Sequence, residues 1–255
     1  MKILFIGDIV GNEGVDFVKQ HLKSIKKLKG IDFFIANGEN AAGGKGIMKS
    51  QAIELFDCGI DVLTMGNHTY NKQDIFELLE DYNVIRPANM PHGSVGTGCI
   101  ELEVGDTSVC VINARGRVYV DPPLDCPFAA VDDILKKAKS NIIFIDFHAE
   151  ATSEKLALAK YLDGRISALV GTHTHVTTAD EQILPKGTAY ITDVGMTGTT
   201  NGIIGVKDDL IISKYLTALP TKFELAEGNT ALNAVIVDVD EDTGKAISIE
   251  RLRIC

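Results

Sequence analysis

The chain has 255 residues, of which 45% are hydrophobic and 24% are charged, and its formal net charge is −10 at pH 7. This length and composition are typical of a globular protein with a sizeable core. The excess of acidic groups argues against binding to long nucleic acid, because no basic stripe is available to replace the counterions of a phosphate backbone. A small anionic ligand is still compatible with the sequence, since bound metal cations can reverse the local potential.

The sequence also bears on location. The apolar run at the start is too short for a signal peptide and leads directly to Asp8. No apolar run is long enough to span a membrane. The five cysteines are odd in number and form no C-x-x-C motif, which argues against a disulfide framework or a thiolate zinc site. We therefore expect a cytoplasmic protein with reduced thiols and no membrane contact.

Apolar runs alternate with amphipathic stretches along the chain. The first third predicts strands at 2–8, 32–40 and 61–68, and helices at 15–27, 50–59 and 71–83. Between residues 84 and 126, Gly and Pro bracket alternating runs that predict antiparallel strands at 99–104 and 108–114. The remainder predicts helices at 128–140, 153–164 and 208–219, strands at 141–150, 167–175 and 188–196, and a hairpin over 233–252.

This order of elements predicts an α/β protein. Because antiparallel strands join the strand–helix units, we expect a mixed sheet, or two sheets packed together and covered by helices. No linker, repeat or shift in composition marks a boundary. We therefore expect a single domain over residues 1–255.

Polar side chains gather where the predicted strands end. These side chains are Asp8, Glu39, Asn40, Asn67, His68, His148, His173 and His175. Functional groups of α/β sheets collect just beyond the carboxyl ends of the strands. His173 and His175 are two positions apart in a segment that we expect to be extended, so both should face the same way. The pattern predicts one shared pocket.

The residue types in this pocket indicate metal ions. Imidazole, carboxylate and amide oxygens suit transition metals of the Mn, Fe or Zn kind. Seven of these eight side chains, all except His68, are the expected ligands. Seven ligands are too many for one ion with an open position, but they suit two ions, roughly 3.5–4 Å apart, that hold a hydroxide between them. Glu39 is the expected bridge. His68 is the expected general acid, because it adjoins Asn67 and yet, as the next residue, should point away from the ligands.

Each motif alone has a simpler interpretation. An Asp at a strand end commonly caps a helix or forms a turn, and Gly-Asn steps favour turns. His148 alone could be a hydrogen-bonded core histidine. The combination, with every motif at a strand end, favours the metal site. Asp193 is a further candidate that would orient a ligand histidine, while Arg115 and Arg117 would hold a phosphate or support an interface.

Five segments occur in a characteristic order: GD at 7–8, GEN at 38–40, GNHT at 66–69, FHAEATSEK at 147–155 and GTHTHV at 171–176. In order and spacing they resemble the calcineurin-like metallophosphoesterase superfamily. Four more segments resemble its bacterial YmdB-like branch: RPAN at 86–89, PLDCPF at 123–128, TADE at 178–181 and DVGMTG at 193–198. The resemblance covers nearly the whole chain, although Tyr70 and Asn71 stand where the branch has Trp-Asp.

The resemblance implies a four-layer sandwich, in which two mixed β-sheets pack face to face between helices, with a dinuclear site at the strand ends. It implies a homo-oligomeric phosphodiesterase whose characteristic substrates are 2′,3′-cyclic nucleotides. The two divalent or trivalent ions would be Fe or Mn, with Zn as an alternative. By motif match, the first ion would be held by Asp8, Asn40 and His175, the second by Asn67, His148 and His173; Glu39 would bridge them, and His68 would donate the proton.

Two alternatives stay open. The same metals could serve a phosphomonoesterase or a nuclease, which a panel of substrates would distinguish. The chain could instead be a metal-bound regulatory or scaffold protein with weak phosphatase or nuclease activity. In that case a catalytically dead variant would keep its cellular effect.

Overall fold

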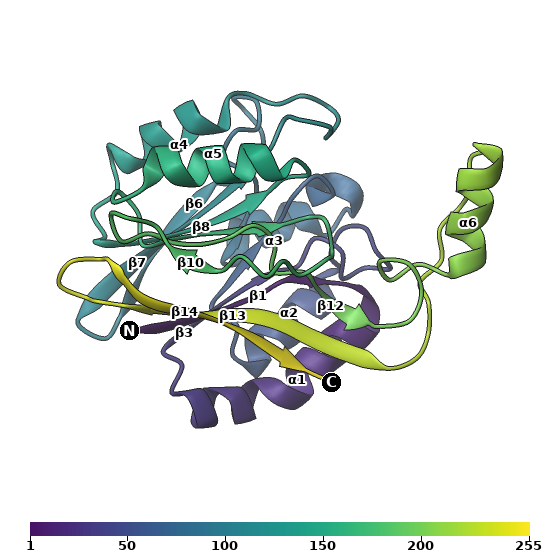
Figure 1. Cartoon of the computed structure of the whole chain (residues 1–255), viewed down its shortest axis with the longest axis horizontal. Helices are drawn as coiled ribbons and strands as arrows, with labels where there is room; N and C mark the ends of the chain where they lie inside the picture. Colours follow the sequence, from purple (N-terminus) through teal and green to yellow (C-terminus); the bar gives the residue numbers. More distant parts are fainter.

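The computed structural model describes residues 1–255. Two β-sheets lie face to face, and helices cover the outer side of each (Figure 1). Helices α1 (Gly11–Lys29), α2 (Lys49–Cys58) and α3 (Ile75–Asp81) pack on the first sheet, and α4 (Pro127–Leu135) and α5 (Thr152–Leu162) pack on the second. The prediction of a four-layer α/β sandwich with two mixed sheets is confirmed.

The first sheet combines strands from both ends of the chain. Its order is β2-β12-β13-β1-β3-β4-β5, with β14 paired to β13. The bounds are β1 Lys2–Ile6, β2 Asp8–Ile9, β3 Phe33–Asn37, β4 Val62–Thr64, β5 Val84–Ile85, β12 Met196–Thr199, β13 Thr230–Val239 and β14 Ala246–Ile254. β1, β3, β4 and β5 are parallel, whereas β13 is antiparallel to β1. This pairing of distant segments supports the proposal of a single domain.

The second sheet has the order β10-β11-β9-β8-β7-β6. Its strands are β6 Cys99–Val104, β7 Thr107–Arg115, β8 Ile142–His148, β9 Ala168–Thr172, β10 Gln182–Ile183 and β11 Ala189–Ile191. The prediction of one strand over 188–196 is wrong. β11 ends at Ile191 in this sheet, and β12 begins at Met196 in the first sheet. Gly195, with a φ of 84°, lets the chain turn between them.

Alternating side chains of β1 build two of the three apolar layers. Ile3 and Phe5 enter the core between the sheets, whereas Leu4 and Ile6 enter the core under the helices of the first sheet, as the period of two in a strand requires. The ring of Phe5 stacks on that of Phe144 from the second sheet, with centroids 5.7 Å apart. The two sheets are thereby fixed relative to each other, and with them the strand ends that carry the polar side chains.

Helix α1 shows how closely the pattern of apolar residues predicts packing. Val15, Val18, Leu22 and Ile25 form its buried stripe, as predicted. The helix begins earlier than predicted, at Gly11, and its end is followed by Gly30 with a φ of 65°. The predicted helix over 71–83 is shorter, because a 3-10 turn at Thr69–Asn71 precedes α3.

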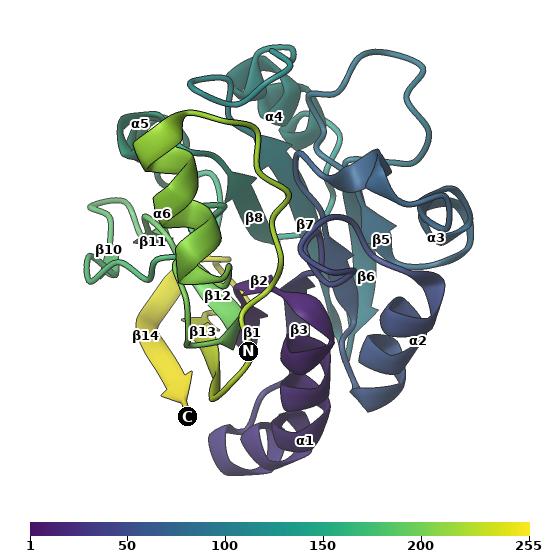
Figure 2. The same cartoon turned by 90° about the vertical axis from the view of Figure 1, so that its right-hand side faces the viewer.

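Helix α6 (Asp208–Thr217) stands away from the sandwich in Figure 1, and in Figure 2, seen from that side, it lies in front of the sheets. Its prediction is confirmed except for its last two residues. Ile212, Tyr215 and Leu216 on this helix and Leu219 just after it are exposed. Among the helices, none combines the length and the apolar character needed to cross a membrane.

Candidate metal centre

Strand ends of both sheets meet at one edge of the sandwich, and the structure brings all eight predicted site residues together there. Asp8 lies in β2, Glu39 and Asn40 follow β3, Asn67 and His68 follow β4, His148 ends β8, and His173 and His175 follow β9. The parallel strands β1, β3 and β4 of one sheet, and β8 and β9 of the other, all point their carboxyl ends toward this edge.

Asp8, Asn40 and His175 form one half of the cluster. The Nδ2 atom of Asn40 lies 3.1 Å from Nε2 of His175 and 3.4 Å from Oδ1 of Asp8. Nδ1 of His175 lies 3.2 Å from the carbonyl oxygen of Ile204. Because a carbonyl can only accept, Nδ1 is the protonated nitrogen, and Nε2 presents its lone pair to the cluster.

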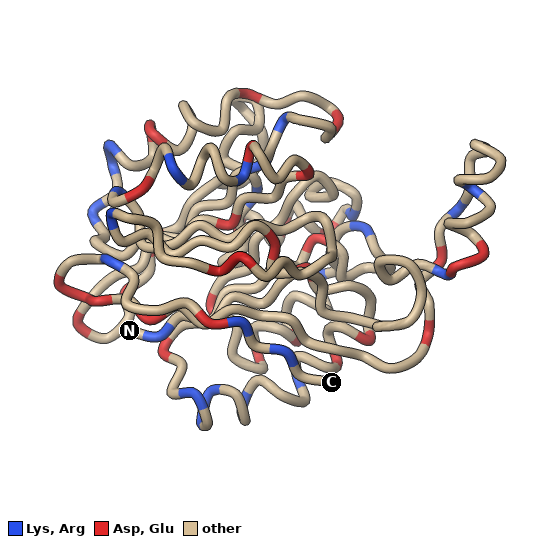
Figure 3. The backbone as a smooth tube through the Cα atoms, in the orientation of Figure 1, with Lys and Arg blue, Asp and Glu red and all other residues tan.

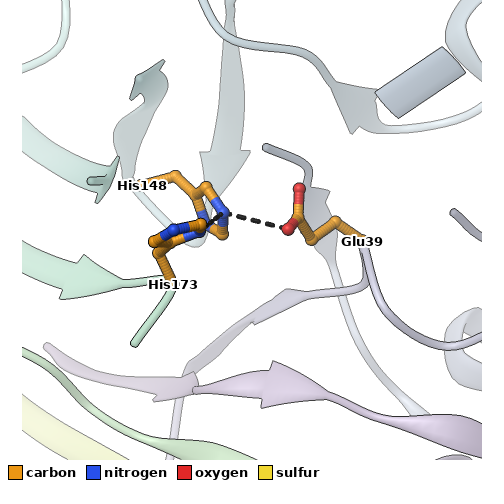
Figure 4. Close-up of side chains that lie close together, drawn as sticks. All are labelled: Glu39, His148 and His173. Atoms are coloured by element: carbon orange, nitrogen blue, oxygen red, sulfur yellow. Dashed lines mark hydrogen bonds and ion pairs between the residues drawn. The ribbon is translucent and has the colours of Figure 1, made fainter. Parts of the chain in front are cut away.

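Asn67, His148 and His173 form the other half, next to Glu39. Figure 4 shows Glu39, His148 and His173 pointing toward one another. Nε2 of His148 lies 2.9 Å from Oε1 of Glu39, 3.0 Å from Nδ1 of His173 and 3.1 Å from Oδ1 of Asn67. His148 and Glu39 are buried, so solvent does not separate these atoms.

The turn that carries His173 and His175 differs from the prediction. β9 ends at Thr172, and the two histidines have φ values of 100° and 65°, so the prediction of an extended segment is wrong. They converge because this left-handed turn folds back over the strand end. Nε2 of His173 lies 3.2 Å from Oε2 of Glu150, which turns Nδ1 inward. Positive φ at a non-glycine residue costs on the order of 1–3 kcal/mol and is typical of functional sites.

His68 also differs from the prediction, which placed its side chain away from the ligands. Its Nδ1 lies 2.9 Å from Oδ1 of Asn40 and 3.4 Å from Oε1 of Glu39, and its backbone N–H donates to Oε2 of Glu39 at 3.1 Å. β4 ends at Thr64, so residues 65–68 bend, and the alternation of a strand does not apply to them. A quarter of the His68 side chain is accessible.

Opposite charges are balanced within the cluster. Burial acts to raise the pKa of Glu39, but the imidazoles of His148 and His68 hold the pKa of this carboxyl well below its usual range. Burial acts to lower the pKa of His148, whereas Glu39 and Asp8 raise it, to about 9. Burial and the neighbouring His148 lower the pKa of His173 to about 3. The site therefore favours a positive charge between its carboxylates.

The donor set around His148 fits a metal ion. Its Nε2 can carry one hydrogen, yet three atoms with lone pairs lie within 3.1 Å of it. One hydrogen cannot satisfy all of them, whereas a cation among them can bind all four. Nitrogen and oxygen ligands of this mixture suit Mn, Fe or Zn.

Gly66 is required by the close packing of the cluster. A Cβ atom at this position would overlap the carboxylate of Glu39 and the imidazole of His148. The glycine before Asn67 in the GNH motif therefore lets the loop after β4 approach the ligands.

Several residues beside the cluster were not predicted as part of it. They are Asp146, Glu150, Lys155 and Thr172. One of them had a signal in the sequence, since Asp146 is an acid inside an apolar strand, two positions before His148. Asp193, which we predicted to orient a ligand histidine, contacts none; its Oδ2 pairs with Lys155 at 2.7 Å and accepts from the backbone of Thr174 at 3.1 Å. The predicted partner, a ligand histidine, is therefore wrong, and the partner is Lys155.

The remaining candidates lie outside the cluster. The buried guanidinium of Arg115 donates to the carbonyl oxygens of Val120 and Pro122, so it holds the loop that follows β7. Another histidine, His92, whose role the sequence leaves open, lines a separate cavity of about 650 Å³ beside α4. The hydroxyl of Tyr70 donates to the carbonyl oxygen of Val95.

A two-sheet sandwich with this cluster at its strand ends has the architecture of the metallophosphoesterase class. A family model described as YmdB-like protein matches residues 4–252, and the chain belongs to this family. The 2′,3′-cyclic-nucleotide 2′-phosphodiesterase of Bacillus subtilis (strain 168) is 51% identical over 257 residues, which cover 100% of this chain and 97% of that relative.

Two solved structures agree with this assignment. A hypothetical protein of Thermus thermophilus superposes with a TM-score of 0.95 at 43% identity, over 100% of this chain and 99% of that one. A structure described as a novel phosphatase of Mycoplasma pneumoniae has a TM-score of 0.95 at 33% identity, over 100% and 93% of the two chains. The predicted family is confirmed, and with it the prediction of a phosphoric diester hydrolase.

Proposed function

We propose that the chain hydrolyses 2′,3′-cyclic nucleotides at a site that holds two metal ions. The observation that carries this proposal is the set of lone-pair atoms around Nε2 of His148, from Glu39, Asn67 and His173. The substrate class is taken from the Bacillus subtilis relative, whose name specifies it.

The two halves of the cluster suggest the ligand sets. Asp8, Asn40 and His175 would hold one ion, with Asn40 binding through its amide oxygen because Nδ2 has no free lone pair, and Asn67, His148 and His173 would hold the other. Glu39 would bridge them, which is supported by its position between His148 of one half and the adjacent Asn40 of the other. When bound, such ions activate water as a nucleophile and neutralise phosphate oxygens. Fe or Mn, with Zn as an alternative, is the proposed element.

His68 would supply the proton that the leaving alkoxide needs. Its Nδ1 lies 2.9 Å from Oδ1 of Asn40, an amide oxygen that can only accept a hydrogen bond. This contact would hold a hydrogen on Nδ1 and orient the imidazole, so the proton given to the leaving oxygen would be the one that the protonated ring carries on Nε2. The partly accessible side chain leaves room for an oxygen of the substrate.

A small substrate suits the charge distribution. Figure 3 shows Lys and Arg dispersed among Asp and Glu along the backbone, and the net charge is −10. A long phosphate backbone would meet no continuous basic surface. The proposed partner is therefore a single phosphodiester rather than long nucleic acid.

Turnover by metal-loaded protein tests this function. With Mn²⁺ or Fe²⁺, we expect 2′,3′-cyclic AMP to be opened to the 3′-phosphate and bis-p-nitrophenyl phosphate to be cleaved, with 3′,5′-cyclic AMP, 5′-AMP and an RNA oligomer as comparisons. Loaded protein that cleaves neither of the first two substrates would overturn the proposal. Preference for 5′-AMP or the oligomer would favour the phosphomonoesterase or nuclease alternative.

We also propose that the chain forms a homo-oligomer, as the family resemblance suggests. The exposed apolar side chains on and after α6 support this, because an isolated apolar surface of this kind is commonly covered by a partner. The cytoplasmic location stays a prediction.

A further inference from the structure

The geometry points to Thr172 and Asp146 as positioning residues for His148. We infer that they determine which ring nitrogen of His148 carries the hydrogen, and thereby turn the lone pair of Nε2 toward the metal site. The inference rests on the proposed function, because it concerns one of the proposed ligands.

Three buried groups form a chain of hydrogen bonds behind His148. Nδ1 of His148 lies 2.9 Å from Oγ1 of Thr172, and Oγ1 of Thr172 lies 2.7 Å from Oδ1 of Asp146. All three residues have no accessible surface. No water can therefore replace either contact, and each group must find its partner within the chain.

The direction of these bonds follows from counting hydrogens. An ionised carboxylate can only accept, so the single hydroxyl hydrogen of Thr172 is donated to Asp146. The hydroxyl oxygen is then left to accept, and only a hydrogen on Nδ1 of His148 can fill that role. The neutral imidazole thus keeps its hydrogen on Nδ1, and its lone pair lies on Nε2, the atom that faces Glu39, Asn67 and His173.

Asp146 is itself fixed from the opposite sheet. Its Oδ2 accepts from Oγ1 of Thr64 at 2.5 Å and from Nδ2 of Asn37 at 3.0 Å. Thr64 ends β4 and Asn37 ends β3, whereas Asp146 lies in β8. The hydroxyl and amide of the first sheet occupy one carboxylate oxygen as donors, which leaves the other oxygen to face Thr172.

A carboxylate in this position needs an explanation other than packing. Burial of a charged group is unfavourable unless it is fully hydrogen-bonded, and an apolar residue would fit the interior of the sandwich at less cost. Metal-bound histidines commonly donate their second N–H to a carboxylate or another oxygen acceptor, which sets the tautomer. In this chain the carboxylate would act through the hydroxyl of Thr172 rather than directly.

A pair of substitutions at Thr172 separates this role from packing. Thr172→Val keeps the branched shape and removes the acceptor, whereas Thr172→Ser keeps the hydroxyl and removes a methyl group. We expect Thr172→Val to weaken the binding of one of the two ions by about 10- to 100-fold in competition with a chelator, and Thr172→Ser to stay within about threefold of the original chain. ¹⁵N shifts of the neutral His148 ring, recorded without metal above its pKa of about 9, should show hydrogen on Nδ1 in the original chain and a mixture of both tautomers in Thr172→Val.

Two further variants keep the test decisive. Asp146→Asn would place an amide N–H that donates to Oγ1 of Thr172, so that the hydroxyl of Thr172 would donate to Nδ1 of His148 instead of accepting from it. The affinity for the same ion should then fall, and this variant gives a result even if Thr172→Val does not fold. Thr188→Val is the matched control, because Thr188 is a buried threonine whose hydroxyl donates to the carbonyl oxygen of Ile166 and accepts from the backbone N–H of Gly164, both outside the cluster. It should leave metal affinity unchanged.

The outcomes distinguish this inference from the proposed function. If the original chain binds two ions, and Thr172→Val and Asp146→Asn bind both as tightly, the positioning role is overturned while the metal site stands. Equal losses in Thr172→Val and Thr172→Ser would also overturn it, because packing would then explain both. An original chain that binds no metal would overturn the proposed function and this inference together.

Discussion

Lys155 and Asp193 form an ion pair whose side chains are 0% and 1% accessible, with 2.7 Å between Nζ and Oδ2. Nζ of Lys155 also donates to the carbonyl oxygen of Thr172 at 2.9 Å, and Oδ2 of Asp193 accepts from the backbone of Thr174 at 3.1 Å. The pair thus holds the residues on either side of His173 in the left-handed turn. It stabilises a conformation that the turn would not favour alone.

The first prediction follows from this pair. Lys155→Met removes one charge and leaves the carboxylate of Asp193 buried and unpaired, so we expect the free energy of unfolding to fall by roughly 3–5 kcal/mol. Denaturation in urea measures the change. Lys160→Met, at an exposed position of the same helix, is the control and should change the stability by less than about 0.5 kcal/mol. A loss at Lys155 as small as that of the control would contradict the proposed support of the turn.

The second prediction concerns the proton donor. His68→Ala should lower kcat by on the order of 10²–10⁴, because the leaving alkoxide loses its positioned acid. The metal content should stay that of the original chain. Steady-state kinetics and elemental analysis of the same preparation measure both, with His21→Ala on helix α1 as the matched control. Loss of a metal ion in His68→Ala would make His68 a ligand instead, which its 2.9 Å contact with Asn40 makes a real alternative.

The third prediction is a dependence on pH. Burial raises the pKa of the Cys110 thiol to about 12, and only the thiolate reacts with disulfide reagents. Between pH 7 and pH 9 this group should therefore stay unmodified in the folded chain, while the exposed Cys255 reacts. A thiol count with and without denaturant checks this, since unfolding should make all five cysteines reactive. Rapid labelling of Cys110 in the native protein at pH 8 would contradict it.

The fourth prediction addresses α6. If a second copy of the chain covers its apolar side chains, Tyr215→Ser combined with Leu216→Ser should shift the molar mass in light scattering toward the monomer. Both residues are more than 80% exposed, so the fold itself should keep its melting temperature. The exposed pair Lys136→Ser and Lys137→Ser, which directly follows α4, is the control. A monomeric original chain would contradict the proposal of a homo-oligomer.

Much of this architecture could be predicted from the sequence, because strand ends are local features. The apolar runs before Asp8, Glu39, Asn67 and His148 each form a parallel strand, and parallel strands of a packed sandwich end at a common edge. The grouping of the ligands therefore follows from their order along the chain.

The local conformation of the site could not be predicted in the same way. The spacing of His173 and His175 indicated an extended segment, but the turn is left-handed because Asp193 and Lys155, remote in sequence, hold it. The split of the predicted strand 188–196 between two sheets likewise depends on pairing partners rather than on apolar pattern. The sequence indicated Asp193 as a supporting residue but did not indicate its partner. That partner is Lys155, for which the pattern of apolar residues predicted only a position on a helix.

Elemental analysis of protein purified without a chelator tests the central claim most directly. We predict about two transition-metal ions per chain, falling to about one in His148→Ala, which removes the proposed ligand at the centre of the second half of the cluster. Removal of the ions by a chelator should also lower the melting temperature, because ligands that bind only the folded state stabilise it. A chain that binds no metal after incubation with Mn²⁺, Fe²⁺ and Zn²⁺, or binds the same amount when His148 is replaced, would contradict the account.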